Sequence, residues 1–163
     1  MTAKDVLRGL LRTNDYVIKA YLADLSDEEI LQRPGPGANP IAWQMGHLIQ
    51  SEQSLLNYLT AVSGIELPAG WADQHSAAAA AKDPAGGYRS KAEYLDAYKK
   101  SRDNILKILD AYPDSLLDTA TEGRMKDFAP THGAVLSLIA NHPMMHAGQI
   151  ATLRRRLGKP VVI

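Results

Sequence analysis

Four long segments of this 163-residue chain carry apolar side chains at three- and four-residue spacings, and none shows the alternation typical of a β-strand. The first segment runs from Ala3 to Leu25. The second runs from Pro40 to about Ser63, with Asn39 as its expected N-cap and Pro40 in its first turn. Such spacing gathers apolar side chains on one face of a helix. We therefore expect long helices that share a common core.

The other two segments have clear start and stop signals. Ser90 and Glu93 form a capping box for the third helix, which Pro113 ends, and Thr131 is the expected N-cap of a fourth helix that ends near Gly158. Residues 64–89, rich in proline, glycine and alanine, predict a long connection with one short helical turn, and a second loop follows the third helix. Four long helices with polar connections predict an all-α four-helix bundle, a single domain over residues 1–163.

Charge and cysteine content exclude several classes of function. The 18 basic and 18 acidic residues balance, so no overall field attracts nucleic acid or an anionic membrane. The chain has no cysteine, which excludes thiolate ligands and a cysteine nucleophile and leaves nitrogen and oxygen as metal ligands. Its N-terminus lacks an apolar signal core, and no apolar run is long enough to span a bilayer. We expect a soluble, cytoplasmic protein.

Three of the five histidines lie in segments expected to be core. His142 and His146 are four residues apart, which places their rings on one helix face, about 40° apart, where they can hold one ion. His47 lies in the apolar part of the second helix. Neutral imidazoles suit Zn, Ni, Fe and Cu, and three protein ligands leave a coordination position for water or substrate. The alternative is that these are unrelated histidines satisfied by hydrogen bonds within the bundle.

Pro143 lies between the two close histidines and removes the backbone hydrogen bond to the carbonyl of Ile139. A full break of the helix would separate the two rings. A kink, after which the helix resumes, would keep them adjacent and free the Ile139 carbonyl for other partners. We expect the kink.

Three motifs, in order and at matching distances from both ends, resemble those of a known family. They are Arg33-Pro34-Gly35-Pro36-Gly37 leading into Trp43-Gln44-Met45-Gly46-His47, then His142-Pro143-Met144-Met145-His146-Ala147-Gly148-Gln149-Ile150, and finally Leu157-Gly158-Lys159-Pro160. Together they look like the DinB-like (YfiT-like) superfamily over nearly the whole chain. The resemblance implies an up-down-down-up bundle, often a homodimer, with a divalent metal held by three histidines.

Carried onto this sequence, the implied metal ligands are His47, His142 and His146, with Zn or Ni as the expected ion. The resemblance is to a chemically diverse family that includes thiol-dependent S-transferases and hydrolase-like members. Because the chain lacks cysteine, a thiolate must arrive on a small molecule. We favour metal-assisted transfer of a low-molecular-weight thiol to a small electrophile. The alternatives are a metal-dependent hydrolase of a small substrate and a non-catalytic metal-binding module.

Four further residues are candidates for supporting roles. Gln149, in the Gly-Gln pair that the family shares, is a candidate to orient a ligand ring. Trp43, His132 and Arg154 are candidates to contact substrate, although Trp43 is more typical of a core residue and Arg154 to Arg156 of a solvated helix end. His75 is expected to be a solvated loop histidine. The connections 64–89 and 113–130 are expected to shape the substrate pocket.

Overall fold

The computed structural model describes residues 1–60, 64–84 and 87–161, and its regular elements there are helical. The α-helices are α1 (Ala3–Leu22), α2 (Asp27–Ile30), α3 (Ile41–Leu59), α4 (Trp71–His75), α5 (Lys91–Ala111) and α6 (His132–Arg156). Short 3-10 helices lie at η1 (Ala77–Ala79), η2 (Asp114–Leu116) and η3 (Gly123–Asp127). The all-α prediction is confirmed.

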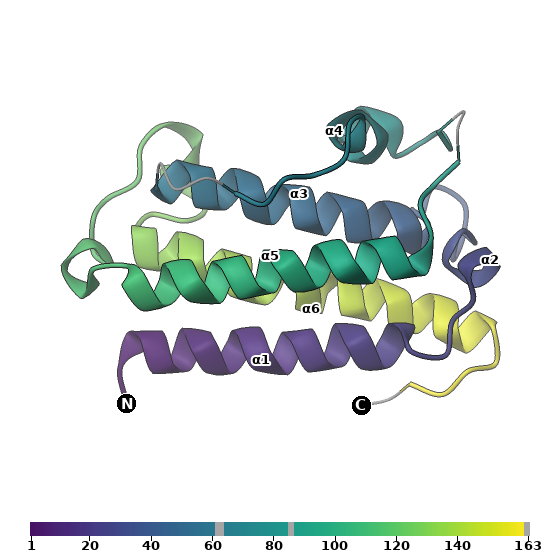
Figure 1. Cartoon of the computed structure of the whole chain (residues 1–163), viewed down its shortest axis with the longest axis horizontal. Helices are drawn as coiled ribbons and strands as arrows, with labels where there is room; N and C mark the ends of the chain where they lie inside the picture. Colours follow the sequence, from purple (N-terminus) through teal and green to yellow (C-terminus); the bar gives the residue numbers. More distant parts are fainter. Residues whose placement is uncertain (61–63, 85–86, 162–163) are drawn as a thin grey trace.

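The four long helices, α1, α3, α5 and α6, form the bundle (Figure 1). The first and last run in one direction and the middle two in the other, so the topology is up-down-down-up, as expected. Each of α1 and α3 packs against both α5 and α6. The parallel neighbours α3 and α5 lie side by side, and the chain must therefore travel back along the bundle between them. Because α3 has 19 residues, that return covers about 28 Å.

Capping chemistry fixes the helix starts. Thr2 and Ser90 accept hydrogen bonds from the backbone N–H groups of Asp5 and Glu93, which complete reciprocal capping boxes, and Thr131 caps α6 as predicted. The first helix is shorter than predicted and ends at Leu22. The residues after it form the separate turn α2, because Ser26 caps a new helix.

Both ends of the second long helix differ from prediction. Pro40, not Asn39, is the N-cap: its φ of −64° suits a helix but its ψ of 156° is extended, so the helix begins at Ile41. The helix ends at Leu59 because the β-branched Thr60 is extended. The predicted end near Ser63 lies outside the described residues.

The return connection contains more helix than the single turn we predicted. The helix α4 and the 3-10 turn η1 follow one another, and α4 packs on the outer side of α3 (Figure 1). Ser76 separates them with an extended backbone, and its side chain caps η1 through the N–H of Ala79. The connection thus covers the N-terminal half of α3 with an ordered wall.

Pro143 does not break α6, which is continuous from His132 to Arg156. The helix continues past the proline, as expected, and the kink itself stays a prediction. The neighbouring helix contacts this turn. The buried side-chain amide of Asn14 in α1 donates to the carbonyl oxygen of Ala140 at 2.5 Å. The proline-containing turn is therefore held from the neighbouring helix.

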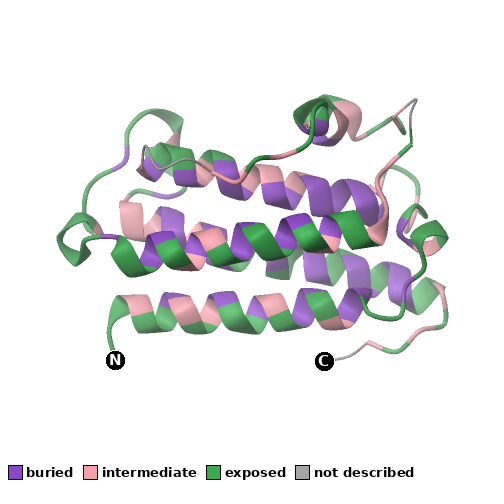
Figure 2. Ribbon diagram, viewed as in Figure 1, coloured by how far each residue is buried: buried purple, intermediate pink, exposed green. Residues whose placement is uncertain are grey.

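A polar layer divides the core of the bundle into two apolar clusters, and buried residues line the facing sides of the long helices (Figure 2). One cluster fills the end near α2 and α4, and the other fills the end near η2 and η3. Between them each long helix contributes buried polar side chains: Asn14, Glu52, Gln53, Ser101, Arg102, His142 and His146. Buried polar groups require partners, so this layer is where function is to be sought. No helix in the described part of the chain has the length and apolarity needed to cross a bilayer.

Candidate metal centre

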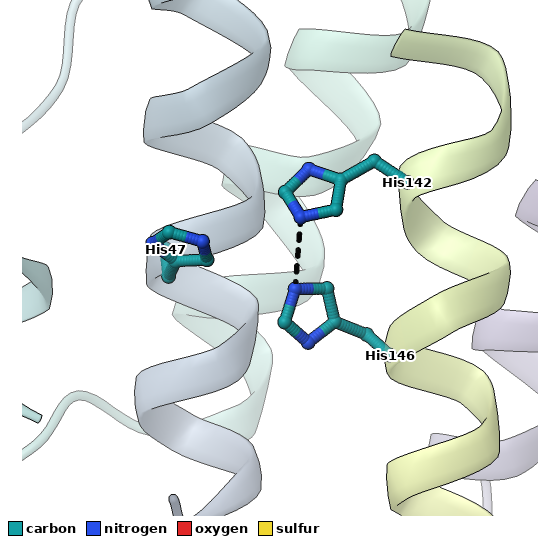
Figure 3. Close-up of side chains that lie close together, drawn as sticks. All are labelled: His47, His142 and His146. Carbon is teal, nitrogen blue, oxygen red and sulfur yellow. Dashed lines mark hydrogen bonds between the residues drawn. The ribbon is translucent and has the colours of Figure 1, made fainter. Parts of the chain in front are cut away.

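Three imidazole rings from α3 and α6 converge inside the polar layer (Figure 3). One nitrogen from each of His47, His142 and His146 lies within 4.8 Å of the others. The Nε2 atoms of His142 and His146 are 3.2 Å apart, and the His47 ring centre is 5.6 and 5.7 Å from theirs. Among the described residues this is the group whose donor atoms can share one ion. The structure therefore brings together the three histidines that the family resemblance implies as ligands.

Burial keeps all three rings neutral at physiological pH. Desolvation, followed by the nearby His142 and His47, lowers the pKa of His146 to about 3. Desolvation and then His47 and Arg102 lower the pKa of His142 to about 4, and desolvation also lowers the pKa of His47. A neutral imidazole keeps a lone pair on one ring nitrogen, which is the form that binds metal ions. The site is thus prepared to receive a cation without first losing protons.

Gln44 orients the ring of His146. Its Oε1 lies 3.3 Å from His146 Nδ1, and its own Nε2 donates to the carbonyl oxygen of Asn39 at 2.9 Å. An Nδ1–H that donates to Gln44 leaves the Nε2 lone pair free toward His142. The predicted orienting residue, Gln149, is exposed and lines a separate hollow beside residues 34–39. That prediction is corrected: the amide comes from the facing helix α3, where it is 1% exposed.

His47 is positioned from two sides. The Trp43 ring stacks on it with centroids 4.6 Å apart and planes at 8°. On the other side, the backbone carbonyl of His75 raises the pKa of His47 against the larger effect of burial. The hydroxyl of Ser51 lies 3.4 Å from His47 Nε2. His75, at the end of α4, therefore helps to position the His47 ring on α3.

His75 is not the solvated loop histidine that we expected, because its side chain is fully buried. Its Nδ1 lies 2.8 Å from the carbonyl oxygen of Trp71, and its Nε2 lies 2.8 Å from the hydroxyl of Tyr94. The ring lies directly over Gly46, where any added Cβ would overlap it. The signal in the sequence was the glycine one residue before His47, which allows this close approach.

Indole nitrogens also attach the wall to α3. Trp71 Nε1 donates to the carbonyl oxygen of Gly46 at 3.1 Å, and Trp43 Nε1 donates to the carbonyl oxygen of Ser76 at 3.3 Å. Trp71 is buried in the apolar cluster beneath. These two hydrogen bonds therefore hold the wall against α3 within one helical turn of His47.

A cavity of about 520 Å³ opens beside the histidines. The α3 side of its lining comprises His47, Gln50, Ser51, Ser54 and Leu55. His75, Ser76 and Ala77 line it from the α4 wall, and Phe128, Leu138, His142 and Met145 line it from the other side. Two of the three converging histidines thus face a space large enough for a small organic molecule.

The family model for the DinB superfamily matches residues 10–150. The chain belongs to the DinB superfamily. Among solved structures, YfiT from Bacillus subtilis, described as a probable metal-dependent hydrolase with an unusual four-helix bundle topology, aligns with a TM-score of 0.67. The alignment covers 96% of this chain and 89% of YfiT at 17% identity, a likeness that shows the shared fold. No curated protein matches the chain.

The remaining predicted contacts of this DinB superfamily chain lie away from the cavity. Trp43 is 5% exposed and stacks on His47 instead of lining the cavity. His132 is the first residue of α6, so it lies about 15 Å along the helix from His142, and its Nδ1 is 2.5 Å from the Tyr112 hydroxyl. Neither residue is placed to contact a substrate at the histidines.

Arg154 is neither a substrate contact nor part of a solvated helix end. Its side chain is 1% exposed, forms an ion pair with Asp24, and donates to the carbonyl oxygens of Tyr21 and Pro160. Two of these partners, Tyr21 and Asp24, lie 133 and 130 residues earlier in the chain, and a local sequence pattern does not reveal such contacts. The arginine therefore fastens the C-terminal segment to α1.

The sequence reasoning also missed the second half of the polar layer. Glu52 of α3 forms a buried ion pair with Arg102 of α5, and its Oε2 accepts a hydrogen bond from Ser101 Oγ at 2.7 Å. Ser101 Oγ in turn accepts from Gln53 Nε2 at 3.0 Å. Burial lowers the pKa of Arg102 to about 9. This cluster lies behind the histidines and closes the α3–α5 contact.

Proposed function

We propose that His47, His142 and His146 bind one divalent metal ion, and that the chain is a metal-dependent enzyme acting on a small molecule in the adjacent cavity. The observation that carries the proposal is the convergence of three neutral imidazoles at the wall of that cavity. Three protein donors leave the remaining coordination positions to ligands from the cavity side, which is the arrangement of catalytic rather than structural sites.

The donor set favours Zn or Ni. Imidazole nitrogen is a good ligand for both, and the absence of cysteine excludes the thiolate coordination of structural zinc sites. The orientation of His146 by Gln44 and of His47 by the His75 carbonyl fits such a role, because ligand rings depend on partners at their other nitrogen.

The reaction that we favour is transfer of a low-molecular-weight thiol to a small electrophile. A bound divalent metal supplies the Lewis acidity that lowers the pKa of a thiol or of water. The thiolate sulfur forms a bond to an electrophilic carbon, the leaving group departs with its electron pair, and the thiol proton passes to solvent. The protein's residues hold the histidine rings in place and separate the reacting atoms from bulk water.

Hydrolysis of a small substrate is the second candidate. It is supported by the structural likeness to YfiT, which is described as a probable metal-dependent hydrolase. The same site would then activate water, whose oxygen forms a bond to the electrophilic carbon while the bond to the leaving group breaks, and the leaving group departs with its electron pair and takes up the proton of water. The two candidates share the metal and the cavity and differ only in the nucleophile.

Metal content tests the shared premise. We expect purified protein loaded with Zn or Ni and desalted to retain about one equivalent, and the variant His146→Ala to lose it while keeping its helical circular dichroism. His132→Ala is the matched control, because that histidine lies on the same helix but outside the cluster. Unchanged metal content in His146→Ala would contradict the assignment.

Activity assays with metal-loaded protein then separate the candidates. A chlorinated dinitrobenzene or bimane electrophile is offered with cysteine, glutathione or coenzyme A, and p-nitrophenyl esters are offered without thiol. Thiol-dependent conjugation that disappears in His146→Ala supports transfer, and ester cleavage without thiol supports hydrolysis. Stoichiometric metal with neither activity on any of these substrates would favour a non-catalytic module.

A further inference from the structure

The lining of the cavity beside the histidines contains no charged side chain among the described residues. Leu55, Leu138, Phe128, Met145 and Ala77 supply apolar surface, and the polar groups are serine hydroxyls, the Gln50 amide and imidazoles. None of the lining residues is an aspartate, glutamate, lysine or arginine. An ionised group that entered this space would lose hydration without gaining an opposite charge from a side chain of the lining.

The nearby charges of the bundle are already paired elsewhere. Arg102 and Glu52 neutralise one another on the α5 side of the polar layer. Arg154, a candidate substrate contact in the sequence analysis, is paired with Asp24 near the end of α1. Neither pair lines the cavity. A charged substrate therefore meets no oppositely charged side chain in the lining.

One polar atom in the lining lacks a partner. The Oε1 atom of Gln50 is buried and has no hydrogen bond from the described residues. Gln50 lies three residues after His47 on α3, and the hydroxyl of Ser54 is already committed to the Gln50 carbonyl oxygen at 3.0 Å. A buried acceptor without a donor is costly, so an N–H or O–H group on a ligand would satisfy it.

The mouth of the cavity is apolar and exposed. Phe128 is 67% exposed and Met145 is 61% exposed, and both line the cavity. Large apolar side chains at a cavity mouth gain free energy when a ligand covers them. Because both residues line the same cavity as His47 and His142, a molecule bound beside these histidines can contact them.

We propose that the cavity takes a small uncharged molecule with an apolar body and a hydrogen-bond donor. The apolar body lies between Leu55, Leu138 and the exposed Phe128 and Met145, and the donor faces Gln50 Oε1. This inference rests on the proposed function in taking the histidine cluster as the reacting centre. It adds the class of substrate, an amide or alcohol of roughly bicyclic size, since cavities of some 300–1,000 Å³ hold such ligands.

Binding of three matched probes tests the inference without any need for turnover. Naphthalene-2-carboxamide is neutral with N–H donors, 2-naphthoate carries a negative charge, and 2-naphthylmethylammonium carries a positive one. Their dissociation constants are measured by ligand-observed NMR in metal-loaded protein and again after chelation. We expect the amide to bind at least about tenfold more tightly than either ion in the chelated protein, because the ions lose hydration.

Two adjacent residues of α6 supply matched variants. Met145 lines the cavity, whereas Met144 is 40% exposed and does not line it. We expect Met145→Lys to weaken binding of the amide about fivefold or more and to strengthen binding of 2-naphthoate, because it places a cation at the mouth. Met144→Lys should change neither constant.

Several outcomes would overturn the inference. They are equal or tighter binding of either ion in chelated protein, no binding of any probe, and equal effects of the two lysine variants. Failure of the proposed function looks different, because metal content and turnover would then be absent while the preference for the amide in chelated protein persists.

Discussion

Two buried polar clusters lie on different sides of α3, five residues apart, and they are built in opposite ways. Around Glu52 the charge is paired with Arg102 and backed by a chain of hydrogen bonds through Ser101 and Gln53. Around His47 the rings are uncharged, oriented from behind, and open to a cavity. The first cluster pairs its two charges with each other, and the second leaves lone pairs for a ligand. The comparison separates a polar cluster that specifies packing from one whose ring nitrogens are available to a ligand.

The largest effect is expected from breaking the sealed cluster. Glu52→Ala leaves the Arg102 guanidinium buried without its partner, so we expect the free energy of unfolding to fall by about 3–5 kcal/mol. Urea denaturation measures this. Replacing both partners, Glu52→Leu with Arg102→Met, should recover most of the loss, whereas a fully stable Glu52→Ala protein would show that the pair does not specify packing.

An intermediate effect is expected where the wall meets α3. Gly46→Ala adds a Cβ that overlaps the His75 ring, so we expect a loss of about 1–3 kcal/mol in unfolding free energy and weaker metal binding as the His75 carbonyl moves from His47. Gly148→Ala is the matched control within α6, because nothing lies within 4 Å of its added Cβ. That variant should be neutral or more stable by up to about 1 kcal/mol.

Thermal denaturation with and without Zn distinguishes the two glycine variants. Equal stability of Gly46→Ala and Gly148→Ala would mean that the His75 ring yields without cost, and it would remove the argument that the wall fixes His47.

The smallest effect near neutrality comes from acid acting on the open cluster. In the folded chain the pKa of His142 is about 4 and that of His146 about 3, against 6.5 in the unfolded chain. Below pH 6.5 the unfolded chain therefore binds more protons, so the stability of chelated protein is complete above that pH and is lost toward pH 4. From pH 7 to 6 the loss should be about 1.4 kcal/mol, because each of the two rings contributes about 0.7 kcal/mol.

Urea midpoints across this range measure the effect. His142→Gln should flatten the dependence, whereas His132→Gln, far along the same helix, should leave it unchanged. An equally steep dependence in His142→Gln would assign the acid sensitivity to other groups.

Local signals predicted the bundle, and long-range partners explain what they missed. Ser90 with Glu93 and the Thr131 cap mark helix starts within a few residues, and the spacing of His142 and His146 fixes a shared face. His47 of α3 was assigned to the site through the family resemblance, because the spacing within one helix does not show which other helix lies beside it. The interhelical partners of Gln44, Arg102 and Arg154 are decided by packing, which no local pattern records.

The burial of His75 is a second feature that the local sequence did not predict. Its alanine-rich surroundings are typical of a solvated loop, and only the contact with Gly46 and Tyr94 reverses that expectation. The glycine beside a candidate ligand was visible in the sequence, but which ring it admits was not.

The parallel arrangement of α3 and α5 has a consequence for how this architecture can acquire new chemistry. The chain must return between them, and here it passes over the outer side of α3, so one boundary of the cavity is made by this returning segment, whereas the converging histidine rings belong to the bundle itself. A change in the length or shape of the segment around Ser76 and Ala77 would change the shape of the cavity, while the histidines of α6 keep their positions. The fold thus separates the segment that shapes the cavity from the helices that carry the histidines.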